Sequence, residues 1–256
     1  MMQKYCRFEA GGVARYGLLR GDVVEELTAA PWTDWNPTGK VHEQSRVRLL
    51  APSEPTKIVC VGRNYHEHAA ELGNEPPREP LIFLKPPSAV IGPEQSIVCP
   101  PMSKRVDHEG ELAVVIGRRC RRLQAGENPR DYVFGYTCVN DVTARDLQKA
   151  DVQFTRGKGF DTFCPFGPLI ETELDVKTST VETLVNGKRR QHAPFTQMVF
   201  SVDVILHWIS QVMTLEPGDL VATGTPAGIA ALAAGDVVEV IVSGIGTLRN
   251  PVAARD

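Results

Sequence analysis

Two glutamates separated by one residue are the most informative chemical feature of the sequence. Glu109 and Glu111 lie in DHEGELAVVIG, where an acidic stretch leads directly into an apolar run typical of a buried strand. Because side chains alternate between the faces of a strand, the two carboxylates are expected to project to the same side. Carboxylates that close repel each other unless a cation lies between them, and oxygen ligands suit Mg²⁺ or Mn²⁺. The pattern indicates a metal site, although two solvated glutamates at a strand edge would produce it as well.

A third carboxylate, Asp141, directly follows the strand-like segment VFGYTCVN and belongs to a polar cluster that runs to Asp146. An aspartate at the end of a strand can complete a three-carboxylate metal site. Aspartate is also a common N-cap of a helix. The residues alone therefore leave two interpretations of Asp141, a metal ligand or a helix cap.

A candidate acid–base pair lies in the segment VGRNYHEHAAE. Residues three apart share one face of a helix, so His68 can hydrogen-bond Glu71, which would orient the imidazole and raise its basicity. The following segment, GNEPPREP over residues 73–80, is expected to be mobile, so the pair would lie on a lid. The alternative is a surface helix pair that contributes about 0.2–0.5 kcal/mol.

Two more polar residues lie where a ligand could approach them. Lys158 stands between two glycines in RGKGFD and could therefore reach a substrate oxygen without steric competition from its neighbours. The spacing is not that of a Walker phosphate loop. Thr225, in TGTP after the strand-like DLVA, is either a hydroxyl donor beside a ligand or part of an ordinary turn.

Strand candidates dominate the segments that must position these residues. They are KIVCVG, LIFLK, ELAVVIG, VFGYTCVN, DLVATGT, DVVEVIVSGIG and a hairpin in TLVNGKRR that turns at Asn186-Gly187. The clearest helix is expected over 201–213, with Ser201 as its cap, and shorter ones over 65–73 and 144–151. Many unequal strands, few helices and no βαβ alternation predict an α+β fold that is mostly β.

The N-terminal part of the chain differs from the rest. Residues 5–27 have the pattern of a small β meander, and residues 31–55 contain several prolines and little periodicity, as expected of a connector. The predicted organisation is a small N-terminal β domain with its connector over residues 1–55 and a catalytic domain over residues 56–256.

Composition excludes several classes of protein. The 256 residues are 42% hydrophobic and carry 28 basic against 31 acidic residues, a net charge of −3, which gives no reason to expect nucleic acid or an anionic membrane as partner. No segment approaches the roughly 20 apolar residues of a membrane span, and the start has no apolar secretion core, so we expect a cytoplasmic protein with a small-molecule partner. Six cysteines without CxxC spacing are expected to be reduced and mostly buried in the core.

Taken together and in order, six segments resemble the fumarylacetoacetate hydrolase family. They are VGRNYHEHAAE, FLKP, DHEGELAVVIG, GYTCVNDVTARDLQ, RGKGFDTFCPFGP and ATGTPAG, within residues 57–250. The resemblance implies a mixed β-sandwich roll, a homodimer and one Mg²⁺ or Mn²⁺ held by Glu109, Glu111 and Asp141. Fumarylacetoacetate hydrolase itself has a longer N-terminal domain and a further acidic ligand near Gly62-Arg63-Asn64, where this chain has none.

The resemblance also implies roles for individual residues. It implies that His68 and Glu71 form the lid dyad, that Lys158 is the electrophilic lysine and that Gln148 positions water or substrate. It implies substrate contacts for Arg63, Arg145 and Thr225.

The short branch of the family shares a 2-oxo acid substrate, which can chelate Mg²⁺ through its carboxylate and keto oxygens. We expect a metal-dependent hydrolase or lyase that cleaves a C–C bond in a short 2-oxo acid, by acylpyruvate hydrolysis or oxaloacetate decarboxylation. Two alternatives remain. One is the 2-hydroxyhepta-2,4-diene-1,7-dioate isomerase or 5-carboxymethyl-2-oxo-hex-3-ene-1,7-dioate decarboxylase of aromatic catabolism, and the other is a non-catalytic metal and ligand binder.

Overall fold

Five strands form the N-terminal unit in the computed structural model, which describes residues 3–254. They are β1 (Lys4–Ala10), β2 (Val13–Arg20), β3 (Val23–Leu27), β4 (Pro37–Glu43) and β5 (Arg48–Leu50). The first three form the expected antiparallel meander. The predicted connector contains two strands, β4 and β5, that the residue pattern did not indicate. β4 is an exposed edge strand that pairs with β3 through its backbone, so it lacks the apolar alternation that marks a half-buried strand.

The N-terminal strands continue into the main sheet of the protein, because β1 also pairs with β14. The further strands of this sheet are β6 (Ile58–Gly62), β7 (Leu81–Lys85), β8 (Val90–Ile91), β11 (Gly110–Ile116), β12 (Val133–Asn140), β14 (Cys164–Glu171) and β17 (Leu220–Ala222). Its strand order is β4-β3-β2-β1-β14-β12-β11-β17-β6-β7, with β5 beside β1 and β8 beside β14. β11 and β14 are buried along their whole length, and β12 is buried beyond its first two residues. The apolar runs ELAVVIG and VFGYTCVN predicted β11 and β12, whereas β14 was not among the predicted strands.

A second sheet packs against the first. It contains β9 (Ile97–Cys99), β15 (Thr180–Val185), β16 (Lys188–Pro194), β18 (Val237–Val242) and β19 (Gly246–Ala254), and β10 (Val106–Asp107) pairs separately with β13 (Thr143–Ala144). The β15–β16 hairpin turns at the predicted Asn186-Gly187, where both residues have positive φ. The structure confirms the predicted α+β, mostly β fold with a small N-terminal β unit.

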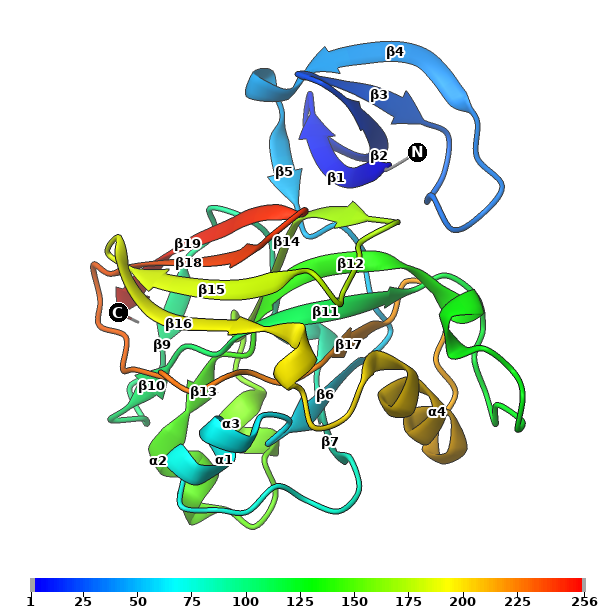
Figure 1. Ribbon diagram of the computed structural model, residues 1–256. Helices are drawn as coiled ribbons and strands as arrows, with labels where there is room; N and C mark the ends of the chain where they lie inside the picture. Colours follow the sequence, from blue (N-terminus) through cyan, green and yellow to red (C-terminus); the bar gives the residue numbers. More distant parts are fainter. Residues whose placement is uncertain (1–2, 255–256) are drawn as a thin grey trace.

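Helices are few and short. They are α1 (His66–Glu71), α2 (Arg145–Ala150), α3 (Thr155–Lys158) and α4 (Val202–Val212), with 3₁₀ turns η1 (Gln44–Arg46), η2 (Pro87–Ala89), η3 (Pro129–Tyr132) and η4 (Phe195–Gln197). Figure 1 shows α1, α2 and α3 lying together at the end of the molecule opposite the N-terminal strands. None of the helices between residues 3 and 254 has the length and apolar character needed to span a membrane.

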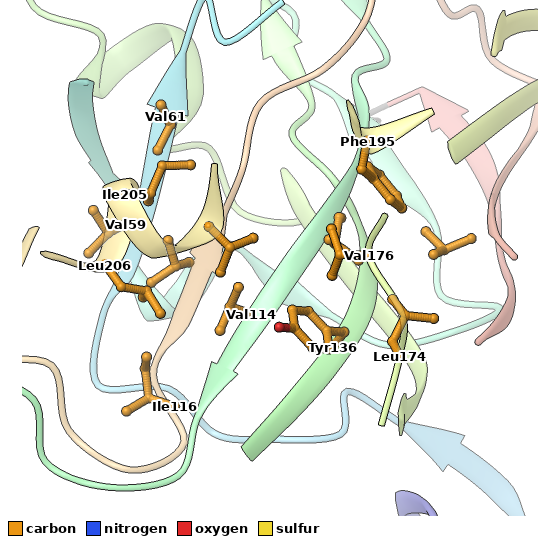
Figure 2. Packing of buried hydrophobic residues seen from close by; sticks show 14 of the residues in the cluster. Val59, Val61, Val114, Ile116, Tyr136, Leu174, Val176, Phe195, Ile205 and Leu206 are labelled. Carbon is orange, nitrogen blue, oxygen red and sulfur yellow. The ribbon is translucent and has the colours of Figure 1, made fainter. Parts of the chain in front are cut away.

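The largest core cluster lies between the main sheet on one side and α4 and the second sheet on the other. Ser201 caps this helix by accepting a hydrogen bond from Val204 N, and Ile205, Leu206 and Ile209 point inward. Figure 2 shows Ile205 and Leu206 beside Val59 of β6. The free cysteines, five buried and one half-buried, agree with the expectation of reduced core thiols.

Truncation of Ile205, which is fully buried, tests how much this helix contributes to stability. We expect Ile205→Ala to lower the free energy of unfolding by about 2–5 kcal/mol, because it removes apolar contacts and leaves a cavity. Urea unfolding followed by circular dichroism measures the change. Val204→Ala, on the exposed face of the same helix, is the control and should change stability little.

Candidate active site

Three buried carboxylates converge where β11 begins and β12 ends. Gly110 of β11 faces Asn140 of β12 in the antiparallel ladder, so Glu109, just before β11, and Glu111, within it, meet Asp141 just beyond β12. One oxygen from each carboxylate lies within 4.8 Å of the others. All three side chains are at most 5% exposed, which excludes solvated glutamates at a strand edge. The second interpretation of Asp141 is also excluded, because the N-cap of α2 is Ala144 and no side chain caps it.

Lys158, at the end of α3, provides a cation to two of the carboxylates. Its Nζ donates to Glu109 Oε2 at 2.7 Å and to Asp141 Oδ2 at 2.6 Å. Burial opposes the charge, but Asp141 and Glu109 outweigh it and raise the pKa of Lys158, so the side chain is an ammonium ion. Although burial favours the neutral acid, Lys158 and Arg145 hold the pKa of Glu109 well below its usual range.

Glu111 has no cationic partner among residues 3–254. Its Oε2 accepts a hydrogen bond from Gly224 N at 2.7 Å, but burial, together with Asp141 and Glu109, raises its pKa well above the usual value. A divalent cation between the three carboxylates would remove this repulsion. The donor set is all oxygen and anionic, which suits Mg²⁺ or Mn²⁺, so the residues present fit a metal.

Arg145, at the start of α2, is held by three partners. Its guanidinium donates to Asp107 Oδ2, Glu109 Oε1 and Gln148 Oε1. It is 2% exposed yet lines the cavity described below. Arg145 therefore orients Glu109 and Gln148 in addition to the substrate contact that the resemblance implies.

Lys85 is part of the site although no role was assigned to it from the sequence. Its Nζ lies 2.6 Å from Asp141 Oδ1 and donates to the carbonyl oxygens of Val142 and Lys158. The signal was a lysine inside the apolar strand LIFLK, because a lysine in a buried run is rarely without a partner. Lys85 thus connects the strand after the lid segment to Asp141.

The predicted acid–base pair lies on α1 over the carboxylates. His68 Nδ1 is 3.3 Å from Glu71 Oε2, and the other oxygen of Glu71 accepts from Gly228 N at 3.1 Å. His68 is 4% exposed. The imidazole is therefore buried, whereas Glu71 is exposed and attaches α1 to the 225–230 loop.

The remaining predicted residues surround one cavity of about 330 Å³. Its walls include all ten candidate residues except Glu71, which lies behind His68. Arg63 has an unusual positive φ of 57° and, like Lys149, has no ion pair with any residue in the described range 3–254. Leu72, Phe83 and Phe154 provide an apolar side, where Lys158 Nζ lies 5.0 Å from the ring centre of Phe83. A volume of this size accommodates a small organic acid.

Asn64 lies in the segment where the resemblance placed a further acidic ligand in fumarylacetoacetate hydrolase itself, and here its side chain bonds only backbone groups. Its amide nitrogen donates to the carbonyl oxygens of Thr223 and Phe200, and its Oδ1 accepts from Phe200 N at 2.7 Å. The side chain is fully buried, and both its nitrogen and its oxygen hydrogen-bond backbone atoms. Asn64 is thus a structural residue that fixes the loop before Gly224.

Comparison with known proteins places most of the chain in one family. Residues 57–253 match the family described as fumarylacetoacetate (FAA) hydrolase, C-terminal, and residues 3–52 match the Rv2993c-like N-terminal family. Protein Rv2993c of Mycobacterium tuberculosis is 48% identical over 233 residues, covering 90% of this chain and 88% of that protein. Oxaloacetate tautomerase YisK of Bacillus subtilis is 41% identical over 227 residues, covering 83% and 75%.

Solved structures show the same fold over nearly the whole chain. A 2-hydroxyhepta-2,4-diene-1,7-dioate isomerase from Mycobacterium marinum superposes with a TM-score of 0.91 at 42% identity, covering 99% of both chains. A maleylpyruvate hydrolase from Sphingobium sp. SYK-6, in complex with manganese(II) and pyruvate, has a TM-score of 0.81 at 32% identity, covering 99% and 100%. The extent of the sequence match and the agreement in fold show that the chain belongs to the fumarylacetoacetate hydrolase family.

Proposed function

We propose that the protein is a Mg²⁺- or Mn²⁺-dependent enzyme that generates the enolate of a short 2-oxo acid by breaking the C–C bond beyond C3. The observation that carries this proposal is one small cavity lined by Glu109, Glu111 and Asp141, by the ammonium of Lys158 and by the imidazole of His68. The manganese and pyruvate in the related hydrolase support the same chemistry.

The three carboxylates would hold the metal, and the bound metal would act as a Lewis acid that favours negative charge on the keto oxygen. Lys158 would stabilise that charge as it develops, since its ammonium already lies among the carboxylates. Arg63 and Lys149, which line the cavity without an ion pair in the described part of the chain, would bind carboxylates of the substrate.

For hydrolysis of an acylpyruvate, His68 would remove a proton from water while Glu71 holds the opposite ring nitrogen. The water oxygen would bond to the distal carbonyl carbon, and the C–C bond would break with its electron pair passing to the pyruvate enolate. A proton then returns to C3. For oxaloacetate the same enolate would form by loss of CO₂, with no water consumed.

A second candidate is proton transfer without bond cleavage, as in an isomerase or tautomerase. It is favoured by the activities named for two relatives, a tautomerase at 41% identity and an isomerase at 42% identity. His68, buried and hydrogen-bonded to Glu71, would then move a proton between carbon and oxygen of the substrate.

Pyruvate release from acetylpyruvate and from oxaloacetate, coupled to lactate dehydrogenase, tests the proposal. With Mg²⁺ or Mn²⁺ we expect turnover of at least one substrate, and after dialysis against EDTA we expect none until metal is restored. If only the decay of enol-oxaloacetate is accelerated, the protein is a tautomerase. Full pyruvate release in excess EDTA would contradict the metal requirement.

The lid gives a further prediction. Residues 66–80 should exchange amide hydrogens rapidly in the free protein and more slowly with Mg²⁺ and oxalate, a mimic of a 2-oxo acid enolate. The reason is that α1 is short and that, among residues 3–254, its hydrogen bond to the body is the one from Gly228 N to Glu71, besides the packing of His68 and Ala69. Slow exchange without ligand, unchanged by oxalate, would show that this segment is not a lid.

A further inference from the structure

A buried side-chain amide on the second sheet hydrogen-bonds β11, the strand that contains Glu111 and directly follows Glu109. Gln191, on β16, is 1% exposed and lies far in sequence from every predicted site residue. Its Oε1 accepts from Gly110 N at 3.0 Å and lies 3.1 Å from His108 Nδ1. Its Nε2 donates to Thr225 Oγ1 at 2.8 Å and to Pro226 O at 2.7 Å. Both ends of the amide are therefore fully used.

The peptide between the two glutamate ligands depends on this side chain. Leu112 O accepts from Thr223 N, so by strand alternation Gly110 presents its backbone groups to the same edge of β11. At that point β17 has ended, and side chains replace the missing strand. Gln191 accepts from Gly110 N, and Thr225 Oγ1 donates to Gly110 O at 2.9 Å. Buried backbone groups need hydrogen-bond partners. The side chains of Gln191 and Thr225 therefore stabilise β11 in the register in which Gly110 lies beside them.

Close packing leaves little freedom around these contacts. A Cβ at Gly110 would lie 2.0 Å from Thr183 Oγ1, because β15 crosses directly over the peptide. A Cβ at Gly228 would lie 2.1 Å from Arg190 O, so the 225–230 loop lies against β16 next to Gln191. The amide of Gln191 thus sits at the meeting point of β11, β16 and this loop.

The same loop receives the lid. Gly228 N donates to Glu71, whose other oxygen contacts His68. A continuous path therefore runs from His68 through Glu71 and the 225–230 loop to Gln191, and from Gln191 to the peptide between Glu109 and Glu111.

We propose that Gln191 is a positioning residue. It would hold the Glu109–Glu111 pair and the 225–230 loop, to which Glu71 of the lid is hydrogen-bonded, in one arrangement. It touches no reacting atom and acts through Gly110, Thr225 and Pro226. Partners behind metal ligands typically change metal affinity about 10- to 100-fold when they are removed. The inference rests on the metal site of the proposed function.

The test combines metal affinity with lid exchange. Gln191→Met removes the amide at similar length, and Gln191→Glu keeps the acceptor for Gly110 N but places an oxygen against Pro226 O. We expect both to weaken Mn²⁺ binding, measured by calorimetry, about 10- to 100-fold, and to lose the oxalate-induced slowing of exchange over residues 66–72. Thr225→Val, which removes the hydroxyl that Gln191 donates to, should weaken Mn²⁺ binding in the same way. Thr225→Ser keeps the hydroxyl and should bind Mn²⁺ more tightly than Thr225→Val, a difference that general destabilisation would not produce.

His192→Met is the matched control, because the neighbouring side chain on β16 is exposed. If folded Gln191→Met and Gln191→Glu bind Mn²⁺ as the wild type does and oxalate protects their lids, the inference is overturned. If Gln191→Met does not fold, Gln191→Glu and the Thr225 pair decide the question in the same way. A wild-type protein that binds no Mn²⁺ would instead overturn the proposed metal site, and this inference with it.

Discussion

Lys158→Ala should lower kcat for acetylpyruvate hydrolysis and for oxaloacetate decarboxylation alike, each by about 10²- to 10³-fold, with a smaller change in KM. Both reactions pass through the same enolate, and the ammonium of Lys158 is placed to stabilise its charge. Because that charge develops only in the transition state, the loss is expected in kcat. Steady-state kinetics of the two reactions on one preparation measure it.

Two controls separate the loss of enolate stabilisation from the loss of any lysine and from the loss of metal binding. Lys188→Ala, on the exposed end of the β15–β16 hairpin, removes a lysine away from the cavity and should leave both reactions unchanged. Mn²⁺ titration shows whether Lys158→Ala still binds metal, since Lys158 contacts Glu109 and Asp141. Equal kcat in Lys158→Ala and wild type would mean that the lysine neutralises carboxylates and takes no part in the reaction.

His68→Ala should separate the two reactions from each other. Hydrolysis needs a base to activate water and should fall by the 10²- to 10⁴-fold typical of a lost general base, about 3–5 kcal/mol of activation free energy. Decarboxylation consumes no water and should fall much less. Glu71→Gln should follow His68→Ala in direction, because Glu71 orients the imidazole. Parallel assays of pyruvate release from both substrates measure the ratio.

Equal losses of hydrolysis and decarboxylation in His68→Ala would contradict a role in water activation. They would place the histidine on a step that both reactions share, such as proton delivery to C3 of the enolate. His66→Ala is the matched control, because His66 lies on the same helix with an exposed side chain.

The local chemistry of the site could be predicted because it depends on short-range patterns. Strand alternation placed Glu109 and Glu111 on one side, and helical spacing placed His68 beside Glu71. The register that brings Asp141 to the pair depends on the pairing of β11 with β12, which no local pattern specifies. The resemblance supplied that association. Burial of the carboxylates then excluded the solvated alternative, and Ala144 at the N-cap of α2 excluded the capping alternative.

The residues that support the site could not be predicted from spacing. Gln191 reaches Gly110 across 81 positions and Lys85 reaches Val142 across 57, so only the packing of two sheets brings them together. Likewise, β4 carries exposed side chains and is a strand because β3 offers it backbone partners. Tertiary pairing, which leaves little trace in a single sequence, decides such positions.

Deuterium incorporation at C3 of pyruvate in D₂O tests most directly whether this site makes the enolate of a 2-oxo acid. We predict that, with Mg²⁺ or Mn²⁺, the protein accelerates loss of the methyl proton signal in ¹H NMR, and that EDTA or Lys158→Ala removes the acceleration. Hydrolysis, decarboxylation and tautomerisation all share this step, so the result does not depend on which one the cell uses. Exchange no faster than in buffer, with metal and pyruvate both bound to folded protein, would contradict the account.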